Sequence, residues 1–476
     1  MLLLHDDRLL PAEPVTRGIA RRLYAGIRDL PIISPHGHTD PRWFAEDKPF
    51  PDPATLFVKP DHYIFRMLYS QGIRLEQLGI ARKDGGQGSG QGNDDVETDP
   101  RRIWKLFASH WHLFRGTPTR LWFEHAASTI FGINERLNAD NADKIYDRIA
   151  EKLEQDAFRP RALFERFNIE AIATTEGALD DLRWHDMIRD SGWGGKVVTA
   201  YRPDSVVDPD FEGFRGNLND FGALTGEDVL SWSGYLEAHR KRRAYFIERG
   251  ATSSDHGHAT ARTANLSQAE CEKLFAKLLK GKFSVEDADL FRGQMLTEMA
   301  KMSLDDGLVL QIHPGSYRNH NPHLFEHFGR DMGSDIPRGL DYVSALKPLL
   351  DAVGNEPTLT VIAFTLDETV YSRELAPLAG HYPALKLGPG WWFLDAPEAM
   401  LRFRELTTET AGFYNTVGFN DDTRAYLSIP ARHDVARRCD CAYLAKLVAE
   451  HRLDEDEAAE VAHDLAYRLA KEAYKL

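Results

Sequence analysis

Cysteine is scarce in this chain of 476 residues, since only Cys271, Cys439 and Cys441 are present. Three cysteines do not make the disulfide framework of a small secreted protein, and they favour a reducing compartment. The opening MLLLHDDRLL has charges directly after three leucines, so its apolar part is too short for a signal peptide. No apolar run approaches the roughly 20 residues of a membrane span. We therefore expect a cytoplasmic protein with no membrane partner.

Positive charge is also in deficit, because 58 Lys and Arg residues face 73 Asp and Glu residues and the net charge is −15. This balance works against a general nucleic-acid or anionic-membrane surface, so we expect no nucleic-acid partner. A local cluster of arginines remains able to bind a small anion. The hydrophobic share of 42% and the charged share of 28% are ordinary for a soluble globular protein.

Several catalytic signatures are missing. The chain has no G-x-S-x-G elbow, no CxxC zinc pair, no convincing dinucleotide fingerprint and no glycine motif that cradles phosphate. The CDC at 439–441 lies in a basic, helix-like stretch, where packing is the better interpretation. Serine hydrolases, redox dithiols and nucleotide-dependent enzymes are therefore not indicated.

Eight short β-type runs alternate with helix-like segments. They are PIISPHGHTD, IEAIATTE, KVVTAYRPD, ATSSDHGH, LVLQIHPGSYR, LTVIAFTLDE, ALKLGPGWWF and FYNTVGFNDDTR. Eight strands alternating with helices predict an α/β protein with a parallel (β/α)₈ barrel. The fourth run is poor in apolar residues, and its assignment rests on its place in the series.

The barrel is interrupted by a segment of different character. We expect an N-terminal helix (Val15 to Leu30) and the first strand within 1–40, a mainly helical insert over 41–168, and the rest of the barrel with C-terminal helices over 169–476. The insert contains KDGGQGSGQGNDD, whose composition predicts a mobile loop. The ending EDEAAEVAHDLAYRLAKEAYKL predicts an amphipathic closing helix.

Polar residues follow the predicted strands, where the active site of such a barrel lies. They are His36, His38, Arg202, Asp255, His256, His313, Arg318, Asp422 and Arg424. Residues that five strands place at the same end of the barrel would border one cavity. Helix-facing or core positions would not collect histidine, aspartate and arginine so selectively.

His36 and His38 lie two residues apart on a strand, so they share a face and could bind one divalent metal. An HxH pair alone is a weak signal, but Asp422 adds a carboxylate from the last run. Asp422 could be a metal ligand or a base, and the alternative is a helix cap ahead of TRAYL. The hypothesis is one divalent ion, zinc, held by His36, His38 and Asp422.

Arg202, Arg318 and Arg424 each follow an apolar run, and a guanidinium suits a carboxylate or a phosphate. Each alone is more often a surface ion pair. Together, and without a phosphate motif, they favour a carboxylate substrate. Tyr63 in DHYIFR reads by default as a core aromatic, and Trp391 follows the seventh run, where a wall of the pocket would lie.

With these residues assembled, the sequence resembles the uronate isomerase family, also called glucuronate isomerases, of the amidohydrolase superfamily. The resemblance spans nearly the whole chain and rests on PHGHTDP, DHYIFR, TTE, YRPD, SDHG, HPGSYRNHN, GPGWWF and DDTRAYLS. It implies a distorted barrel with a helical insert between the first and second strands. It also implies interconversion of D-glucuronate with D-fructuronate and of D-galacturonate with D-tagaturonate.

The resemblance carries catalytic or binding roles to particular residues. They are His36, His38, Tyr63, Arg202, Asp255, His313, Arg318, Asp422 and Arg424. The fourth run has no lysine and the sixth no histidine, which argues against the binuclear hydrolytic centre of the wider superfamily. One metal is implied, with its need for turnover left open, and no nucleotide cofactor is expected. The expected partners are a small uronate and further copies of the chain in a homo-oligomer.

An aldose–ketose conversion through a cis-enediol needs a base, an acid and a carboxylate clamp. We assign the clamp to Arg202 or Arg318, and ring opening to Asp422 with a histidine. Tyr63, its pKa lowered by Arg424 or a metal, is the hypothesis for the C2 base, with Asp422 as the alternative. A mononuclear metal-dependent hydrolase or decarboxylase, and a non-catalytic sugar-acid binding protein, are the competing functions.

Overall fold

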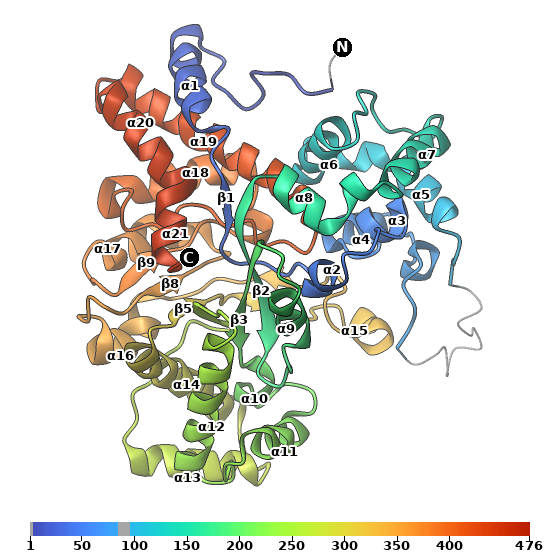
Figure 1. The fold of residues 1–476 in the computed structure, drawn as a ribbon. Helices are drawn as coiled ribbons and strands as arrows, with labels where there is room; N and C mark the ends of the chain where they lie inside the picture. Colours follow the sequence, from blue (N-terminus) through green and yellow to red (C-terminus); the bar gives the residue numbers. More distant parts are fainter. Residues whose placement is uncertain (1–2, 84–95) are drawn as a thin grey trace.

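Seven short parallel strands form one curled sheet in the computed structural model, which describes residues 3–83 and 96–476 (Figure 1). The strand order is β1-β2-β3-β4-β5-β8-β9, so strands consecutive in the barrel are neighbours. Their bounds are β1 Ile32–Ser34, β2 Ile169–Gly177, β3 Lys196–Arg202, β4 Ser253–His256, β5 Val309–Ile312, β8 Val361–Ala363 and β9 Leu385–Leu387. Each lies in one of the first seven predicted runs, the weak fourth run included. The predicted α/β class and distorted barrel are confirmed.

The eighth predicted run, FYNTVGFNDDTR, differs from the prediction because it forms no strand. It lies beside β9 through a single parallel bridge between Leu387 and Thr416. Near its other end, the N–H of His38 donates to the Thr423 carbonyl at 3.0 Å. Gly418, at a φ of +74°, interrupts the extended backbone between these contacts. An irregular segment therefore spans the gap between β9 and the chain after β1.

Helices surround the sheet, and Figure 1 places the N-terminal helix α1 beside the C-terminal helices α19 and α20. Outside the insert they are α1 Pro14–Ile27, α9 Arg183–Asp190, α10 Asp204–Val207, α11 Phe214–Thr225, α12 Trp232–Ile247, α13 Gln268–Leu279, α14 Val285–Asp306, α15 Pro322–Phe328, α16 Val343–Val353, α17 Ala376–Ala379, α18 Pro397–Ala411, α19 Ile429–Ala449, α20 Glu455–His463 and α21 Leu469–Ala473. Strands β6 (Ser316–Tyr317) and β7 (Ile336–Pro337) form a separate antiparallel pair. The predicted N-terminal and closing helices are present, the latter with a π-type turn between α20 and α21.

The described chain between β1 and β2 contains helices and no strand, as the insert was predicted to do. Its α-helices are α2 Pro41–Glu46, α3 Pro53–Phe57, α4 His62–Tyr69, α5 Pro100–Ser109, α6 Pro118–Thr129, α7 Ala142–Leu153 and α8 Pro160–Arg166. Three of them begin at an Asp-Pro pair, where the proline suits the first helical position and the carboxylate of Asp40, Asp52 or Asp99 accepts a backbone N–H. Apart from Lys83, the predicted mobile loop lies outside the described residues, and the division of the chain at 40 and 168 stays a prediction.

Tyr426 joins the insert to the segment that closes the barrel. Its ring packs edge-on against Phe44, with the ring centroids 5.1 Å apart, and its hydroxyl donates to the Pro160 carbonyl at 2.9 Å. The residue is fully buried in the apolar core of the insert. Since Tyr426 follows Arg424 by two residues, this contact holds the polar residues of the last run over the sheet.

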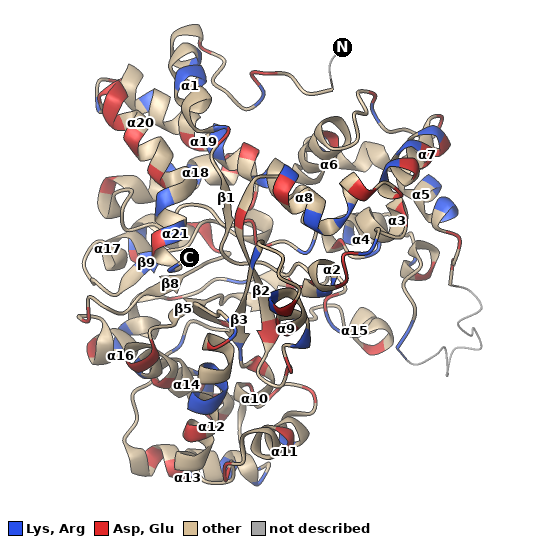
Figure 2. Cartoon of the chain, in the orientation of Figure 1, with Lys and Arg blue, Asp and Glu red and all other residues tan. Residues whose placement is uncertain are grey.

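Charged residues lie mostly on the helices, and Figure 2 shows both signs interspersed along helices such as α7. A membrane-crossing helix is not found within the described parts of the chain, since no helix there combines the length and hydropathy needed. The three cysteines are buried and form no disulfide.

One ion pair is buried between two long helices. Arg404 of α18 donates through Nε to Asp440 Oδ1 of α19 at 2.7 Å and through Nη2 to Oδ2 at 3.1 Å. Both residues are at most 6% exposed. Removing one charge would leave the other buried without compensation.

We therefore expect Asp440→Asn to destabilise the protein by about 3–5 kcal/mol, because the Arg404 guanidinium would keep its desolvation cost and lose its counter-charge. Arg452→Gln is the matched control, since Arg452 contacts Glu409 of α18 on the surface. Differential scanning calorimetry should show a clear fall in Tm for the first variant and almost none for the second. Equal Tm values for both variants would contradict the expected cost of the unpaired charge.

Candidate active site

A cavity of about 380 Å³ opens where the strands end, a volume within the roughly 300–1,000 Å³ of small-molecule sites. Nine of the predicted site residues line it: His36, His38, Tyr63, Arg202, His313, Arg318, Trp391, Asp422 and Arg424. The tenth, Asp255, is fully buried and contacts two of the lining side chains. The sequence therefore predicted which residues meet in the cavity, and their roles in catalysis stay predictions.

Asp422 lies against the two histidines that follow β1. Its Oδ1 is 3.5 Å from His36 Nε2 and 3.2 Å from His38 Nε2. His36 is buried, whereas the His38 side chain is 28% exposed toward the cavity. The turn between them is tied to β2, because the Thr175 hydroxyl donates to the Gly37 carbonyl at 2.9 Å.

This arrangement sets the charge of the carboxylate. Burial by itself would raise the pKa of Asp422, but His36 and His38 outweigh it and lower the pKa well below its usual range. Burial lowers the pKa of His36 to about 4, so this ring is neutral near neutral pH. Asp422 is thus an ionised carboxylate that faces two imidazoles.

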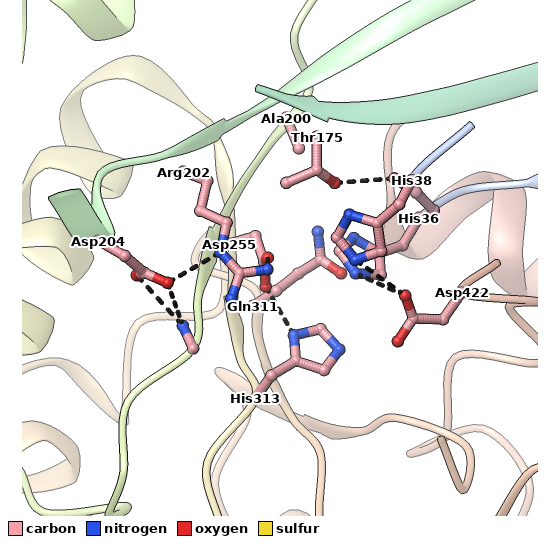
Figure 3. A network of polar contacts seen from close by, with 12 residues as sticks. His36, His38, Thr175, Ala200, Arg202, Asp204, Asp255, Gln311, His313 and Asp422 are labelled. Carbon is pink, nitrogen blue, oxygen red and sulfur yellow. Dashed lines mark hydrogen bonds and ion pairs between the residues drawn. The ribbon is translucent and has the colours of Figure 1, made fainter. Parts of the chain in front are cut away.

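A second chain of contacts runs through the other side of the site (Figure 3). Arg202 donates through Nη1 to Asp255 Oδ2 at 2.8 Å, and Asp255 Oδ1 lies 2.6 Å from His313 Nδ1. The His313 ring stacks on His36, with the centroids 4.7 Å apart. Burial would raise the pKa of Asp255, but Arg202 and His313 hold it well below its usual range. An ionised Asp255 therefore holds Arg202 and orients His313.

The donors fit a divalent ion. His36, His313 and Asp422 each offer a ligand atom, and these atoms lie within 4.8 Å of one another. His313 Nε2 is buried and finds no hydrogen-bond partner among the described residues. Imidazole and carboxylate ligands suit zinc. This trio differs from the predicted set, because His313, which directly follows β5, takes the place that the sequence assigned to His38.

The pKa of Tyr63 differs from the expectation. The sequence hypothesis lowers its pKa through Arg424 or a metal, whereas burial raises the pKa well above its usual value. The nearest cationic influence is Arg432, whose guanidinium lies 5.7 Å from the Tyr63 ring and 3.5 Å from the Trp122 ring. Arg432 also pairs with Asp395. Tyr63 is therefore a neutral phenol in this cavity.

The arginines of the cavity differ in how they are paired. Arg318 donates to Asp335 at 2.8 Å, and Arg424 donates to Asp331 at 3.1 Å. Arg330 makes no ion pair with any described residue, and its guanidinium lies 4.1 Å from the Phe211 ring. It is the cavity arginine whose charge is available to an anionic ligand.

Sequence reasoning missed Arg330 and Arg432. Neither follows a predicted strand directly: Arg330 lies after α15, and Arg432 lies in the first turn of the long helix α19. Arg432 does lie in a stretch rich in apolar residues, YLSIPAR, where a charged side chain needs a buried partner. That was the one signal available for it, and for Arg330 we find none.

A second cavity of about 330 Å³ shares His38, Thr175 and Gly177 with the first. It also contains Glu176, which is buried and accepts hydrogen bonds from the hydroxyls of Thr174 and Thr199. Burial raises the pKa of Glu176 to about 8, and the two hydroxyls offset only part of this rise. The carboxyl group is therefore protonated near neutral pH.

Comparison with known proteins agrees with this geometry. The family model for glucuronate isomerase matches residues 12–474. The uronate isomerase of Mesorhizobium japonicum is 68% identical over the full length of both chains. A crystal structure of glucuronate isomerase from Caulobacter crescentus has a TM-score of 0.96 at 62% identity, covering 100% of this chain and 98% of the other. The uronate isomerase structure from Thermotoga maritima, with a TM-score of 0.90 at 24% identity and 99% of both chains covered, supports the fold.

We expect the stability of the protein to fall as pH rises from about 4.5 to about 8, with Glu176 as one cause. Unfolded glutamate titrates near 4.3, so over this range the folded chain holds a proton that the unfolded chain has lost. Glu176→Gln should remove this contribution and flatten the profile, by a term on the order of 1 kcal/mol per pH unit. Denaturant unfolding of both proteins across that range measures it. A variant profile parallel to that of the unchanged protein would disprove the buried proton.

Proposed function

The chain belongs to the glucuronate isomerase family and is a uronate isomerase, and we propose that the cavity at the strand ends carries out its reaction. The reaction interconverts D-glucuronate with D-fructuronate and D-galacturonate with D-tagaturonate. The observation that carries this assignment is the position of Asp422, an ionised carboxylate against two imidazoles in a cavity that also holds arginines. Full-length similarity to uronate isomerases favours this reaction over the hydrolase or decarboxylase alternative.

The clamp on the substrate carboxylate is Arg330 in this proposal. Arg202 and Arg318, which the sequence suggested, already pair with carboxylates of the protein. A guanidinium without a counter-charge gains most from a substrate carboxylate, because no existing ion pair has to be given up. Arg318 also lines the cavity and can add a second contact.

Asp422 is the base that takes the C2 proton. Removal of this proton, with protonation of the C1 carbonyl oxygen, gives the cis-enediol. Return of a proton to C1 and loss of the C2 hydroxyl proton give the ketouronate. Asp422 is ionised and faces the cavity, and His38 at 3.2 Å can pass protons between this carboxylate and the sugar hydroxyls.

Tyr63 acts as a proton donor. A phenol whose pKa is raised by burial holds its proton near neutral pH, so it can donate a hydrogen bond to the C1 oxygen as negative charge develops there. The Arg432 guanidinium behind its ring favours such charge in the same region. This reverses the role that the sequence hypothesis assigned to Tyr63.

A divalent ion, zinc by the chemistry of the donors, would be held by His36, His313 and Asp422. Bound there, it would supply Lewis-acid polarisation of a sugar oxygen. The protein groups already provide a base, a donor and a clamp. We therefore propose that the isomerase does not depend on the ion.

Two variants separate the base from the donor. We expect Asp422→Asn to lower kcat by about 10²–10⁴-fold and to abolish exchange of the C2 proton, since the base is lost. Tyr63→Phe should lower kcat by about 10²–10³-fold and leave slow exchange measurable, since a donor is lost and the base remains. Proton NMR of D-glucuronate in D₂O, with and without a chelator, follows ketouronate formation and deuterium incorporation.

Tyr69→Phe, on the same helix as Tyr63 and outside the cavity lining, is the control and should behave as the unchanged enzyme. Exchange that survives in Asp422→Asn and disappears in Tyr63→Phe would reverse the two roles. Loss of activity on chelation, restored by zinc, would contradict the independence from the metal. A folded enzyme that leaves both uronates unchanged would refute the proposed site.

The clamp makes a separate prediction. Arg330→Met should raise KM for uronates by about 10–100-fold, since a charge-assisted hydrogen bond contributes about 1.5–3 kcal/mol, with a smaller effect on kcat. Arg215→Met, an exposed arginine on α11, is the control. Steady-state kinetics on D-glucuronate measures both variants. An unchanged KM in Arg330→Met together with a raised KM in Arg318→Met would move the clamp to Arg318.

A further inference from the structure

The tripeptide His-Gly-His occurs twice in the chain, at 36–38 after β1 and at 256–258 at the end of β4. The two ring pairs have almost the same geometry. His36 and His38 have centroids 5.4 Å apart at an interplanar angle of 78°, and His256 and His258 have centroids 5.8 Å apart at 80°. Each pair also faces an aspartate from a different segment. The first pair lines the catalytic cavity, and the second pair does not.

The second pair forms a ligand cluster with Asp204. One ligand atom from each of Asp204, His256 and His258 lies within 4.8 Å of the others. Because successive side chains of a strand point to opposite faces, and Asp255 contacts His313, His256 points away from that contact. Asp204 and Gly257 line the catalytic cavity, whereas the two histidines do not. The cluster is therefore a separate site behind the wall of the cavity.

The two histidines are buried without partners. His256 is 0% exposed and His258 is 3% exposed, and none of their four ring nitrogens has a hydrogen-bond partner among the described residues. Buried polar atoms are nearly always hydrogen-bonded to protein or to ordered water, so four unsatisfied nitrogens in one place point to a bound group. Burial lowers the pKa of His256 to about 3, which keeps its ring in the neutral form that metals bind.

Asp204 is oriented as a metal-ligating carboxylate would be. Its Oδ2 accepts from Arg202 Nε at 2.8 Å, and the Gly257 N–H lies 3.3 Å from both of its oxygens (Figure 3). Hydrogen bonds to the outer side of a ligating carboxylate are a common feature of metal sites. A side chain at Gly257 would have its Cβ clash with Arg202 Nη2 and lie 3.0 Å from Asp204 Oδ2, so glycine permits the close approach of this ion pair.

The arginines near the cluster are all paired with carboxylates. Arg202 pairs with Asp204 of the cluster and with Asp255. Arg292 of α14 pairs with Asp208 and Asp210, and Arg243 of α12 pairs with Asp306. None of these arginines is left as an unpaired positive charge that would repel a cation.

We propose that Asp204, His256 and His258 bind a divalent transition-metal ion of the zinc type at a second site, separate from the catalytic cavity. Two imidazole nitrogens and one carboxylate oxygen are a donor set of zinc sites, with water as the fourth ligand. The bound ion holds Asp204 in place, and Asp204 in turn holds the Arg202 guanidinium in the cavity wall. This site is structural and needs no property of the isomerase reaction.

The test uses the full-length chain with the first site removed by His36→Asn and Asp422→Asn. This double variant, stripped with a chelator and loaded with Zn²⁺, should retain one ion per chain by elemental analysis after gel filtration. X-ray absorption of the loaded protein should show two imidazole nitrogens at about 2.0 Å. Adding His258→Ala should abolish this binding. A double variant that binds no zinc would overturn the proposal.

His239→Ala is the matched control in the same background. His239 is a fully buried histidine whose Nε2 also lacks a partner among the described residues, but it lies on α12 outside the cluster. This variant should keep the ion, and retention of the ion in the His258→Ala protein would refute the assignment. If His258→Ala does not fold, Asp204→Asn replaces it, because the amide keeps the shape of the carboxylate and should weaken zinc binding at least tenfold. Unchanged zinc affinity in Asp204→Asn would overturn the proposal as well.

Discussion

The contact of Asp422 with His36 and His38 is the interaction on which the rest of this site depends. The last β-type run forms no strand, so no continuous ladder of strand hydrogen bonds joins β9 to β1. The closure is made by the Asp422 contacts and by the His38 N–H, which donates to the Thr423 carbonyl. Polar groups of the reaction thus also join the two ends of the barrel. This explains why an irregular segment can sit at the point where a strand was expected.

Burial disfavours the charged form of each group in the site. Contacts with neighbouring side chains decide which groups are charged nonetheless. Desolvation opposes charge on every carboxylate here, yet Asp255 and Asp422 stay ionised because cations or imidazoles face them within hydrogen-bond distance. The imidazole beside Glu176, that of His185, lies 3.7 Å away and its pKa is lowered to about 4 by burial, and Glu176 keeps its proton. Tyr63 is desolvated in the same way, and the Arg432 guanidinium at 5.7 Å from its ring compensates only part of that cost. Similar side chains within one region therefore differ in protonation state, which suits the roles of base, donor and structural group that we propose for them.

The sequence predicts the barrel well because strand ends carry their polar residues at a fixed place in each βα unit. Even the weak fourth run could be assigned from its position in the series. The eighth run could not be judged in this way, since Gly418 breaks its extended backbone in a manner that apolar spacing does not reveal. Arg330 and Arg432 were missed for a related reason: they reach the cavity from a loop and from a helix, through tertiary packing that no local pattern encodes. The pKa of Tyr63 was mistaken because the depth of its burial is not a property of the DHYIFR motif.

The two His-Gly-His segments show how position in the barrel changes the use of one tripeptide. A side chain would be accommodated at Gly37, where the nearest atoms lie 3.4 Å or more from an added Cβ, whereas at Gly257 it would clash with Arg202. After β1 the second ring remains 28% exposed and borders a cavity, so protons and substrate can reach it. At the end of β4 both rings are buried and their nitrogens have no partner among the described residues, so these nitrogens can contact only a group bound inside the protein. A ring that borders the cavity can be reached by substrate, whereas an enclosed pair can hold an ion that positions its neighbours. The roles that we propose for the two tripeptides therefore differ because the first pair lines the cavity and the second does not.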